Sequence, residues 1–501
     1  MGKHLEELVT YSYRPIDLSY IGAVLGWDQQ VNMPPLGVET RANQLSTLSA
    51  IIHELATSDE MCKLLEAAES EVAGCEYDSD EASMVRAARR NYDKLTRLPT
   101  EFVVRQTQAT SKAYTAWTQA RAESNFALFR SNLEEVVALE QERTGYLGYT
   151  DHPYDALLDQ YEPRMKTAQV EKLFETLKAG LVPLVQAIAQ AEPIDDSFFE
   201  EQEYDLSRQW DFTMMLLGDI GYDFQRGRQD KAPHPFTTNF STQDVRVTTR
   251  LLKNRPQSAF FSSLHEGGHA LYEQGINPEF DRTALAGGAT MGLHESQSRM
   301  WENQVGRSES FWRHYYPIMR AFFPEQMRDV SFERFYRGIN KVKPDFIRVE
   351  ADEVTYNLHI FVRFELEKDL ITGALKVADI PDAWNAKYQA YLGITPPNDA
   401  QGCLQDVHWT GMFGYFPTYT LGNLISAQLY AQAQKDLPGL EEGFAQAEFA
   451  PLLDWTREKV HRHGAKFNAE ELLERTIGQT IQAQPLLDYI KRRYSAIYNL
   501  E

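Results

Sequence analysis

Helical periodicity over most of the chain is the feature that most restricts the fold. Apolar residues recur at spacings of three and four in segments such as "SDEASMVRAARRNYDKL" and "SNFALFRSNLEEVVALEQERTGYLG". Similar patterns occupy "TAQVEKLFETLKAGLVPLVQAIAQA", where Pro183 is expected to kink or split a helix, "FIRVEADEVTYNLHIFVRFELEKDLITG" and "AQPLLDYIKRRYSAIYNLE". No repeat, low-complexity tract or flexible linker interrupts them. The sequence therefore predicts a mainly α protein.

One stretch, from His234 to Leu251, departs from the helical pattern. It reads "HPFTTNFSTQDVRVTTRL" and is rich in Thr, Val and Phe, and its "DVRVTTR" portion alternates as a half-buried strand does. A small antiparallel sheet is therefore expected here. Its edge could bind an extended peptide by backbone hydrogen bonds, or the hairpin could simply cover the core.

Composition excludes several classes of protein. The chain has 501 residues, 43% of them hydrophobic and 12% aromatic, which is ample for a large core. Its 72 acidic and 50 basic side chains give a net charge of −22, so a nucleic-acid partner is not expected. Three cysteines without a C-x-x-C pair form neither a disulfide framework nor a thiolate metal site. There is no signal peptide and no apolar run long enough for a membrane span, so we expect a cytoplasmic protein.

The stretch "FFSSLHEGGHALYEQG" carries the motif H-E-x-x-H on an expected helix. His265 and His269 lie one turn apart on the same face and can bind one metal ion. Glu266 lies about 100° around the helix, where it can act as a general base beside the ion. Gly267 and Gly268 each cost about 1 kcal/mol in a helix interior, which indicates that a partner helix or a substrate backbone packs closely there.

A catalytic metal needs a third protein ligand. The next segment, "TMGLHESQSRMWENQVG", offers His294, Glu295 and Glu302, and spacing alone does not choose among them. Two histidines and one glutamate are the usual set for peptide hydrolysis and leave a net charge of one on the ion, which favours a glutamate.

A loop rich in glycine and aromatic residues begins at Gly402, with the sequence "GCLQDVHWTGMFGYFPTYTLGN". His408, Tyr415 and Tyr419 carry donors that could stabilise an oxyanion. The alternative is that these rings, with Asp406 and Trp409, merely close the core.

The chain resembles the carboxypeptidase Taq family of thermostable zinc metallocarboxypeptidases over nearly its whole length. Besides HEGGH, the resemblance rests on HPF and DVRVT in the strand-like stretch, HESQ at His294, IRVEAD at Ile347 and GCLQDVHW at Gly402. A further similarity is "GWDQQVNMPPLG" around Trp27. Six motifs in the family's order make coincidence untenable.

The resemblance implies the metal ligands His265, His269 and Glu295, with Glu266 as the catalytic acid and base. It also implies a large helical body of two lobes around a deep active-site groove, with the small sheet beside the metal helix, and a homodimer. The whole chain, 1–501, is expected to form one metallocarboxypeptidase domain, with an N-terminal helical lobe to about residue 200 and a catalytic portion over 201–501. Many H-E-x-x-H peptidases carry an acidic residue one turn beyond the third ligand, but Arg299 stands there in this chain, so the carboxylate that orients a ligating histidine is not predicted.

We therefore expect a carboxypeptidase that releases amino acids one at a time from the C-terminus of peptides. It would use one zinc ion per chain, with cobalt as the alternative metal, and a proton carried by Glu266. One alternative is an oligopeptidase that cuts inside short peptides with the same chemistry. Another is an inactive helical metal-binding protein. Peptides are the expected partners, and membranes are not.

An exopeptidase of this kind needs a group that recognises the free carboxylate of its substrate. Arginine is the best partner because its planar guanidinium pairs with a carboxylate at two points. Arg348 of IRVEAD is the first candidate and Arg246 of DVRVT the second, and His234 of HPF is grouped with them as substrate-binding. The competing interpretation of Arg348 is an ion pair within a long helix, with Glu350, Asp352 or Glu353 as the partner.

Overall fold

The computed structural model describes residues 1–500, which form two compact units. The first unit comprises Met1–Thr96, Asp195–Ile339 and Leu429–Thr480, and the second comprises Arg97–Ile194, Asn340–Gln428 and the segment from Ile481 onward. Each unit is thus assembled from three separate segments of the chain. The N-terminal lobe expected to about residue 200 and the catalytic portion over 201–501 stay predictions.

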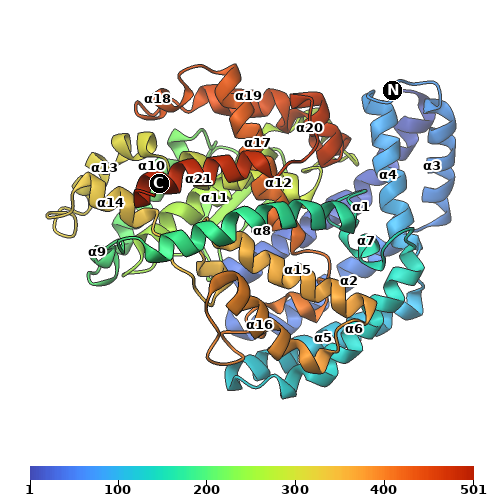
Figure 1. Ribbon diagram of the computed structural model, residues 1–501. Coiled ribbons are helices and arrows are strands. Elements are labelled where there is room, and N and C mark those ends of the chain that lie inside the picture. Colours follow the sequence, from blue (N-terminus) through green and yellow to red (C-terminus); the bar gives the residue numbers. More distant parts are fainter. Residues whose placement is uncertain (501) are drawn as a thin grey trace. The chain divides into compact units, whose positions relative to one another are not determined.

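The fold is mainly α, as the periodicity predicts (Figure 1). No helix of the described residues is long and apolar enough to cross a membrane. In the first unit the α-helices are α1 (Lys3–Val31), α2 (Val38–Ala56), α3 (Asp59–Val72), α4 (Asp80–Thr96), α9 (Ser197–Glu200), α10 (Leu206–Asp219), α11 (Pro256–Gly275), α12 (Met291–Arg299), α13 (Glu309–Phe322), α14 (Phe332–Ile339), α18 (Leu440–Phe444), α19 (Ala450–Lys459) and α20 (Ala469–Ile477).

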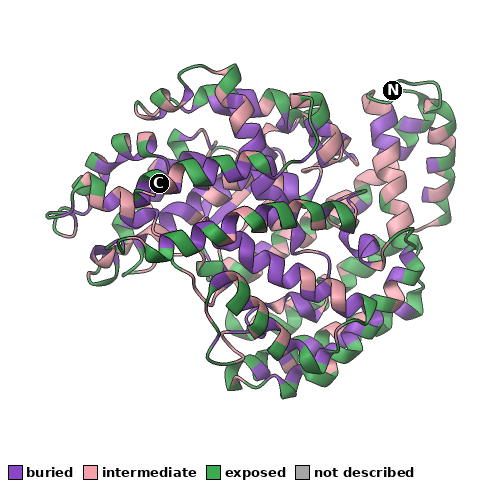
Figure 2. Cartoon of the chain, in the orientation of Figure 1, coloured by how far each residue is buried: buried purple, intermediate pink, exposed green. Residues whose placement is uncertain are grey.

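The helices of the second unit surround α15, whose side chains are buried on nearly every face (Figure 2). Helix α17 begins in the second unit and ends in the first. The α-helices of the second unit, with α17 included, are α5 (Thr100–Glu123), α6 (Ala127–Leu147), α7 (Pro153–Leu158), α8 (Thr167–Gln190), α15 (Tyr356–Thr372), α16 (Ile380–Leu392), α17 (Pro417–Asp436) and α21 (Gln484–Tyr498). Short 3-10 turns are η1 (Pro35–Gly37), η2 (Pro278–Phe280), η4 (Arg348–Glu350), η5 (Val377–Asp379), η6 (Val407–Thr410) and η7 (His461–Lys466), and η3 (Met300–Val305) is a π-helix.

Two helices differ from what the sequence predicts. Helix α8 runs through Pro183 as one helix, so of the kink or split expected there the split does not occur. The helix expected to include Arg348 begins only at Tyr356, because the Asp352 carboxylate accepts hydrogen bonds from the backbone N–H groups of Val354 and Thr355 and thereby ends the preceding loop. Arg348 lies instead on the short turn η4.

The expected sheet is present in the first unit, and it is mixed. Strands β2 (Thr237–Ser241) and β3 (Asp244–Thr249) pair antiparallel, as the alternation of "DVRVTTR" predicts. A third strand, β1 (Gln229–Lys231), pairs parallel with β3 on its other side, which gives the order β1-β3-β2. With only three polar residues, β1 carries no alternation from which it could be predicted.

The two glycines of the metal helix allow close packing. A Cβ at Gly268 would lie 2.5 Å from the carbonyl oxygen of Gln297, so the backbone of α12 crosses α11 at this point. A Cβ at Gly267 would lie 2.8 Å from the side chain of Leu217 on α10. A neighbouring helix, as expected, explains both glycines. The close crossing sets α12 beside the histidines of α11.

Candidate metal centre

Three side chains of the first unit converge on one point. The Oε2 atom of Glu295, on α12, lies 3.6 Å from Nε2 of His265 and 3.5 Å from Nε2 of His269, both on α11. A tetrahedral zinc ion with bonds of about 2.0–2.1 Å separates its ligand atoms by about 3.4 Å, so the spacing fits such an ion. Among residues 1–500 this is the one group of His, Cys, Asp or Glu whose ligand atoms all lie within 4.8 Å of one another.

The carboxylate that orients His265 comes from Glu302. Its Oε2 lies 2.8 Å from Nδ1 of His265, which leaves Nε2 of that ring directed at the metal position. Glu302 stands two turns beyond Glu295, in the π-helix η3 that continues α12. The sequence analysis considered Glu302 as a possible third ligand. In the structure it instead occupies the position of the carboxylate that orients a histidine, which the sequence did not predict.

Arg299 connects the two glutamates. It donates from Nε to Oε1 of Glu295 at 2.7 Å and from Nη1 to Oε2 of Glu302 at 3.1 Å. Burial opposes the ionisation of Glu302, but the charge of Arg299 and the hydrogen bond with His265 lower its pKa to about 2. Burial likewise opposes ionisation of Glu295, and Arg299 and His265 lower its pKa. Both carboxylates are therefore charged at neutral pH, as a cation site requires.

His269 is hydrogen-bonded to a second histidine, His294, on the ring nitrogen that points away from the metal position. Its Nδ1 lies 2.6 Å from Nδ1 of His294, and Nε2 of His294 lies 2.7 Å from Oε1 of Glu273. If Nε2 of His269 binds a metal, its Nδ1–H donates to His294, whose Nε2–H donates to Glu273, so one set of tautomers satisfies the whole chain. Burial lowers the pKa of His269 to about 3, which keeps the ring neutral as a ligand must be.

Strand β2 supplies two contacts to this centre. The Thr237 hydroxyl donates to Oε2 of Glu266 at 2.7 Å, and Nδ2 of Asn239 donates to Oε2 of Glu273 at 2.7 Å. Burial raises the pKa of Glu266, against the opposing effects of His265 and the Thr237 bond. The sequence offered no signal for Thr237, Asn239 or Glu273, apart from the position of the strand just after HPF.

Two other motif residues of the first unit, Arg246 and His234, are not among the three residues that converge on the metal position. Arg246 forms two hydrogen bonds to Asp244, at 2.9 and 2.8 Å, and its guanidinium lies 4.4 Å from the centre of the Trp27 ring on α1. These contacts link strand β3 to α1. His234 is exposed.

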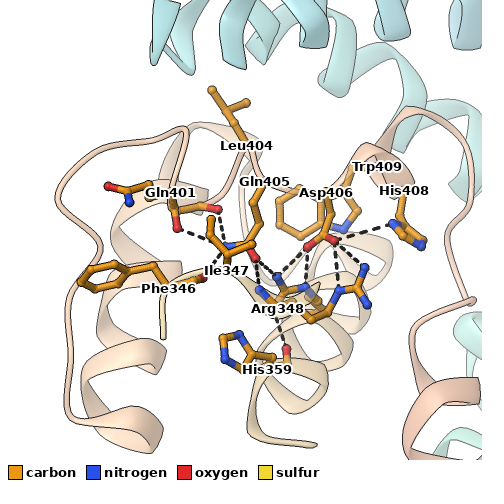
Figure 3. Close-up of polar contacts among 12 residues, drawn as sticks. Phe346, Ile347, Arg348, His359, Gln401, Leu404, Gln405, Asp406, His408 and Trp409 are labelled. Carbon is orange, nitrogen blue, oxygen red and sulfur yellow. Dashed lines mark hydrogen bonds and ion pairs between the residues drawn. The ribbon is translucent and has the colours of Figure 1, made fainter. Parts of the chain in front are cut away.

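In the second unit, Arg348 and His408 lie beside Asp406 (Figure 3). Arg348 donates from Nε and Nη2 to Oδ1 of Asp406, at 3.1 and 3.0 Å, and Arg363 donates from Nε to Oδ2 at 2.6 Å. The competing interpretation of Arg348, an ion pair within a helix, is therefore wrong, because its partner lies 58 residues away. Arg348 is buried, and its guanidinium lies 4.9 Å from the centre of the Tyr419 ring.

His408 lies next to Asp406 among aromatic rings. Its Nε2 is 3.4 Å from the Tyr419 hydroxyl, and the rings of Tyr415 and Phe416 pack beside it. Burial lowers the pKa of His408 to about 4, although Asp406 opposes this effect. The imidazole is therefore neutral at pH 7 and can donate one N–H. The metal centre is built wholly by the first unit and this cluster wholly by the second.

Comparison with known proteins identifies the family. The family model described as "Carboxypeptidase Taq (M32) metallopeptidase" matches residues 7–494. The chain belongs to the carboxypeptidase Taq (M32) metallopeptidase family.

Relatives of this M32 chain match it over nearly their whole length. It is 41% identical to thermostable carboxypeptidase 1 of Thermus thermophilus over 503 residues, with 98% of each chain covered. It is 40% identical to carboxypeptidase 1 of Bacillus subtilis, with 95% of each covered. The crystal structure of an M32 carboxypeptidase from Deinococcus radiodurans R1 superposes with a TM-score of 0.97 at 41% identity, over 99% of this chain and 100% of that one.

Membership of the M32 family makes this chain a metal-dependent carboxypeptidase, a peptide hydrolase, as its motifs predicted. The family also implies a divalent metal, and the His265, His269 and Glu295 cluster fits one. The oligopeptidase and the inactive binding protein are not favoured by these comparisons.

Proposed function

We propose that this carboxypeptidase uses one zinc ion per chain, held by His265, His269 and Glu295. The observation that carries the proposal is the convergence of three ligand atoms whose histidines are each hydrogen-bonded on the opposite ring nitrogen. When bound, zinc supplies a Lewis acid that polarises the scissile carbonyl and makes water a stronger acid. Nitrogen and carboxylate ligands in this number suit zinc, with cobalt as the alternative.

In this proposal Glu266 carries the proton. It takes a proton from the attacking water and gives it to the nitrogen of the departing amino acid. Its burial favours the protonated form, which it must hold between these two steps. Thr237 fixes the orientation of the carboxylate through Oε2. His408, Tyr415 and Tyr419 are proposed as the donors that stabilise the oxyanion, and the neutral state of His408 suits this role because a neutral imidazole keeps one N–H.

Arg348 is the proposed partner of the substrate's free carboxylate. Arg348 and Arg363 share the single carboxylate of Asp406, so this buried cluster has one more positive than negative charge. A buried charge without a partner is unfavourable, and a substrate carboxylate would complement it. Arg246 is a weaker candidate because Asp244 already occupies its guanidinium. His234 remains a proposed substrate contact on the strength of its motif alone.

A digest of mixed peptides followed by mass spectrometry tests the function. With zinc added, we expect single residues to leave stepwise from the C-terminus, and a chelator should stop the release. Internal fragments would instead indicate the oligopeptidase. Absence of products from a protein that binds zinc stoichiometrically would indicate an inactive metal-binding protein.

The carboxylate anchor is tested with matched substrates. Arg348→Ala should lower kcat/KM on a free-acid peptide by about 2–4 kcal/mol in transition-state stabilisation, the usual cost of unpairing a buried charged hydrogen bond. The variant should barely distinguish that peptide from its C-terminal amide. Equal proportional losses on acid and amide would assign Arg348 a structural role, because Asp406 and Arg363 would then be its relevant partners.

We also propose a homodimer that acts on peptides in the cytoplasm. Helix α2 has no buried residue, and beside it Leu36 is 98% exposed, while Val38 and Ile51 on α2 are 55% and 42% exposed. Such a surface is suited to burial against a second copy.

A further inference from the structure

Glu367 is a buried carboxylate that the reaction described above does not use. It lies on α15 with 0% exposure and accepts three hydrogen bonds from two segments of the second unit, α7 and residues 406–416. The Tyr154 hydroxyl on α7 donates to Oε2 at 2.7 Å, the Gly414 backbone N–H donates to Oε2 at 3.0 Å, and Trp409 Nε1 donates to Oε1 at 3.2 Å. Two of these donors belong to residues 406–416, which we call the His408 loop.

The His408 loop has little freedom around these two bonds. Trp409 follows His408 directly and is buried, with its ring packed edge-on against Trp384 at 5.7 Å. Gly414 has a φ of +90°, and a Cβ there would lie 2.6 Å from the backbone of Leu157 on α7. Glu367 therefore holds the loop at Trp409 and again at Gly414. Trp409 is the residue next to His408, so the first of these hydrogen bonds lies one residue from the imidazole.

No cation pairs with Glu367 among the contacts of residues 1–500, which distinguishes it from Glu365 on the same helix. Glu365 forms ion pairs with Lys178 and Lys387. The titratable groups that face Glu367 are Tyr154, Tyr161 and Glu140, and Glu140 in turn pairs with Arg143. Burial raises the pKa of Glu367 to about 8, the three donors oppose this rise, and the charge of Glu140 adds to it.

The donors respond differently to the two states of the carboxyl group. When Glu367 is ionised, both loop donors make charge-assisted bonds, which are about twice as strong as neutral ones. When it is protonated, its O–H must point at the Tyr154 oxygen, because an indole N–H and a backbone N–H cannot accept a hydrogen bond. Gly414 and Trp409 then keep only bonds to a neutral carboxyl group.

We propose that Glu367 is a positioning residue for the carboxypeptidase reaction: it fixes the loop that carries His408, and it fixes that loop more firmly when ionised. The inference rests on the proposed role of His408 in stabilising the oxyanion. It implies that kcat rises with pH between about 7 and 9, as Glu367 loses its proton. This rise adds to any pH dependence of kcat that comes from groups at the metal centre.

The test compares Glu367→Gln with Glu365→Gln in the zinc-loaded enzyme. Glutamine keeps the shape of the side chain but presents an NH₂ group to donors, so it mimics the protonated state at every pH. We expect Glu367→Gln to lower kcat by about tenfold at pH 9 with less effect on KM, and to abolish the rise between pH 7 and 9. Glu365→Gln, which alters the same helix outside the loop, should keep the pH profile of the wild type.

A second readout does not depend on turnover. In protein labelled with 5-fluorotryptophan, the ¹⁹F resonance assigned to Trp409 by the Trp409→Phe variant should shift with a midpoint near pH 8 in the wild type and stay constant in Glu367→Gln. This measurement holds even if the proposed peptidase chemistry fails, so the two failures can be told apart. Metal content should be the same in all variants, since Glu367 belongs to the other unit.

Two results would overturn the proposal. One is a Glu367→Gln enzyme whose activity falls by the same factor at every pH. The other is a Trp409 resonance that does not titrate in the wild type. If Glu367→Gln does not fold, Tyr154→Phe replaces it: loss of this donor should move the midpoint of the ¹⁹F titration and of the kcat rise to higher pH, and an unmoved midpoint contradicts the proposal.

Discussion

Individual residues at the metal centre have different proposed roles: ligands, a base and groups that orient them. Glu266 bonds to Thr237, whereas Glu295 lies against the two imidazoles. Glu266→Gln should therefore lower kcat by orders of magnitude and leave the metal content near that of the wild type. Kinetics together with metal analysis of the purified variant check this. If the folded variant instead lost metal to the same extent as activity, Glu266 would have to be a metal ligand.

Measured metal affinities should distinguish the proposed third ligand, Glu295, from its neighbour His294. Glu295→Ala removes the proposed third ligand, while His294→Ala removes only the hydrogen bond to Nδ1 of His269. Loss of such an orienting contact usually costs about 10–100-fold in metal affinity, so Glu295→Ala should cost more than that range and His294→Ala should fall within it. Competition with a chromogenic chelator measures both. An empty site in His294→Ala beside a filled one in Glu295→Ala would reverse the assignment.

At the scale of elements, the approach of α12 to α11 determines whether the ligands meet. Gly268→Ala places a methyl group 2.5 Å from the Gln297 carbonyl oxygen, so the helices must separate, at a typical cost of about 1–3 kcal/mol. We expect a lower Tm and weaker metal binding. Gly26→Ala on α1 is the matched control, because its Cβ meets nothing within 4 Å and should stabilise by about 0.5–1 kcal/mol. Equal Tm values for the two variants would refute the close crossing.

The Asp406 cluster joins η4, α15 and the His408 loop, and its charge makes stability depend on pH. Burial opposes ionisation of Asp406, but Arg363 and Arg348 lower its pKa below the ordinary value of 3.8. A lowered pKa gives stability that is present above 3.8 and lost as the pH falls through the folded value. Asp406→Asn should therefore destabilise by about 3–5 kcal/mol at pH 7, because it leaves two buried arginines without an anion. Thermal unfolding at pH 7, 4 and 2.5 should show the difference from the wild type narrowing below pH 4.

The exposed helix position Asp382 provides the control for that experiment. Asp382→Asn on α16 removes a carboxylate of the same length from the surface of the same unit. It should leave the Tm at pH 7 almost unchanged. A comparable loss in both variants would mean that general charge, and not the arginine pair, sets the effect.

The sequence predicted the parts of the site that share a local pattern. His265, Glu266 and His269 follow from helical spacing, and β2 and β3 follow from alternation. The partners that complete the site are separated in sequence and carry no pattern: Thr237 reaches Glu266 from another element, and Arg348 meets Asp406 across 58 residues. The start of α15 was missed because the capping hydrogen bonds of Asp352 outweigh the periodicity of the segment before Tyr356.

For the whole molecule, the proposed dimer gives a direct measurement. Light scattering after size-exclusion chromatography should give twice the mass of one chain. Ile51→Glu on α2 should shift the protein to the monomer, because it places a charge on an apolar surface meant for burial. Ser49→Glu is the control, because Ser49 is also exposed but lies two residues from Ile51, on the opposite face of the same helix, and this variant should leave the dimer intact. A wild-type protein that is monomeric at micromolar concentration would contradict the proposal.

The assembly of each unit from three separate segments has a consequence for biosynthesis. The first segment of the first unit ends at Thr96, but the last residues of that unit are not made until Thr480. At about 5–20 residues per second, on the order of 20–80 s pass between these two points. The second unit waits longer still, for the helix that ends at Tyr498. Neither unit can complete its core until most of these 500 residues have been made, so the nascent chain exposes apolar surface of both units until then.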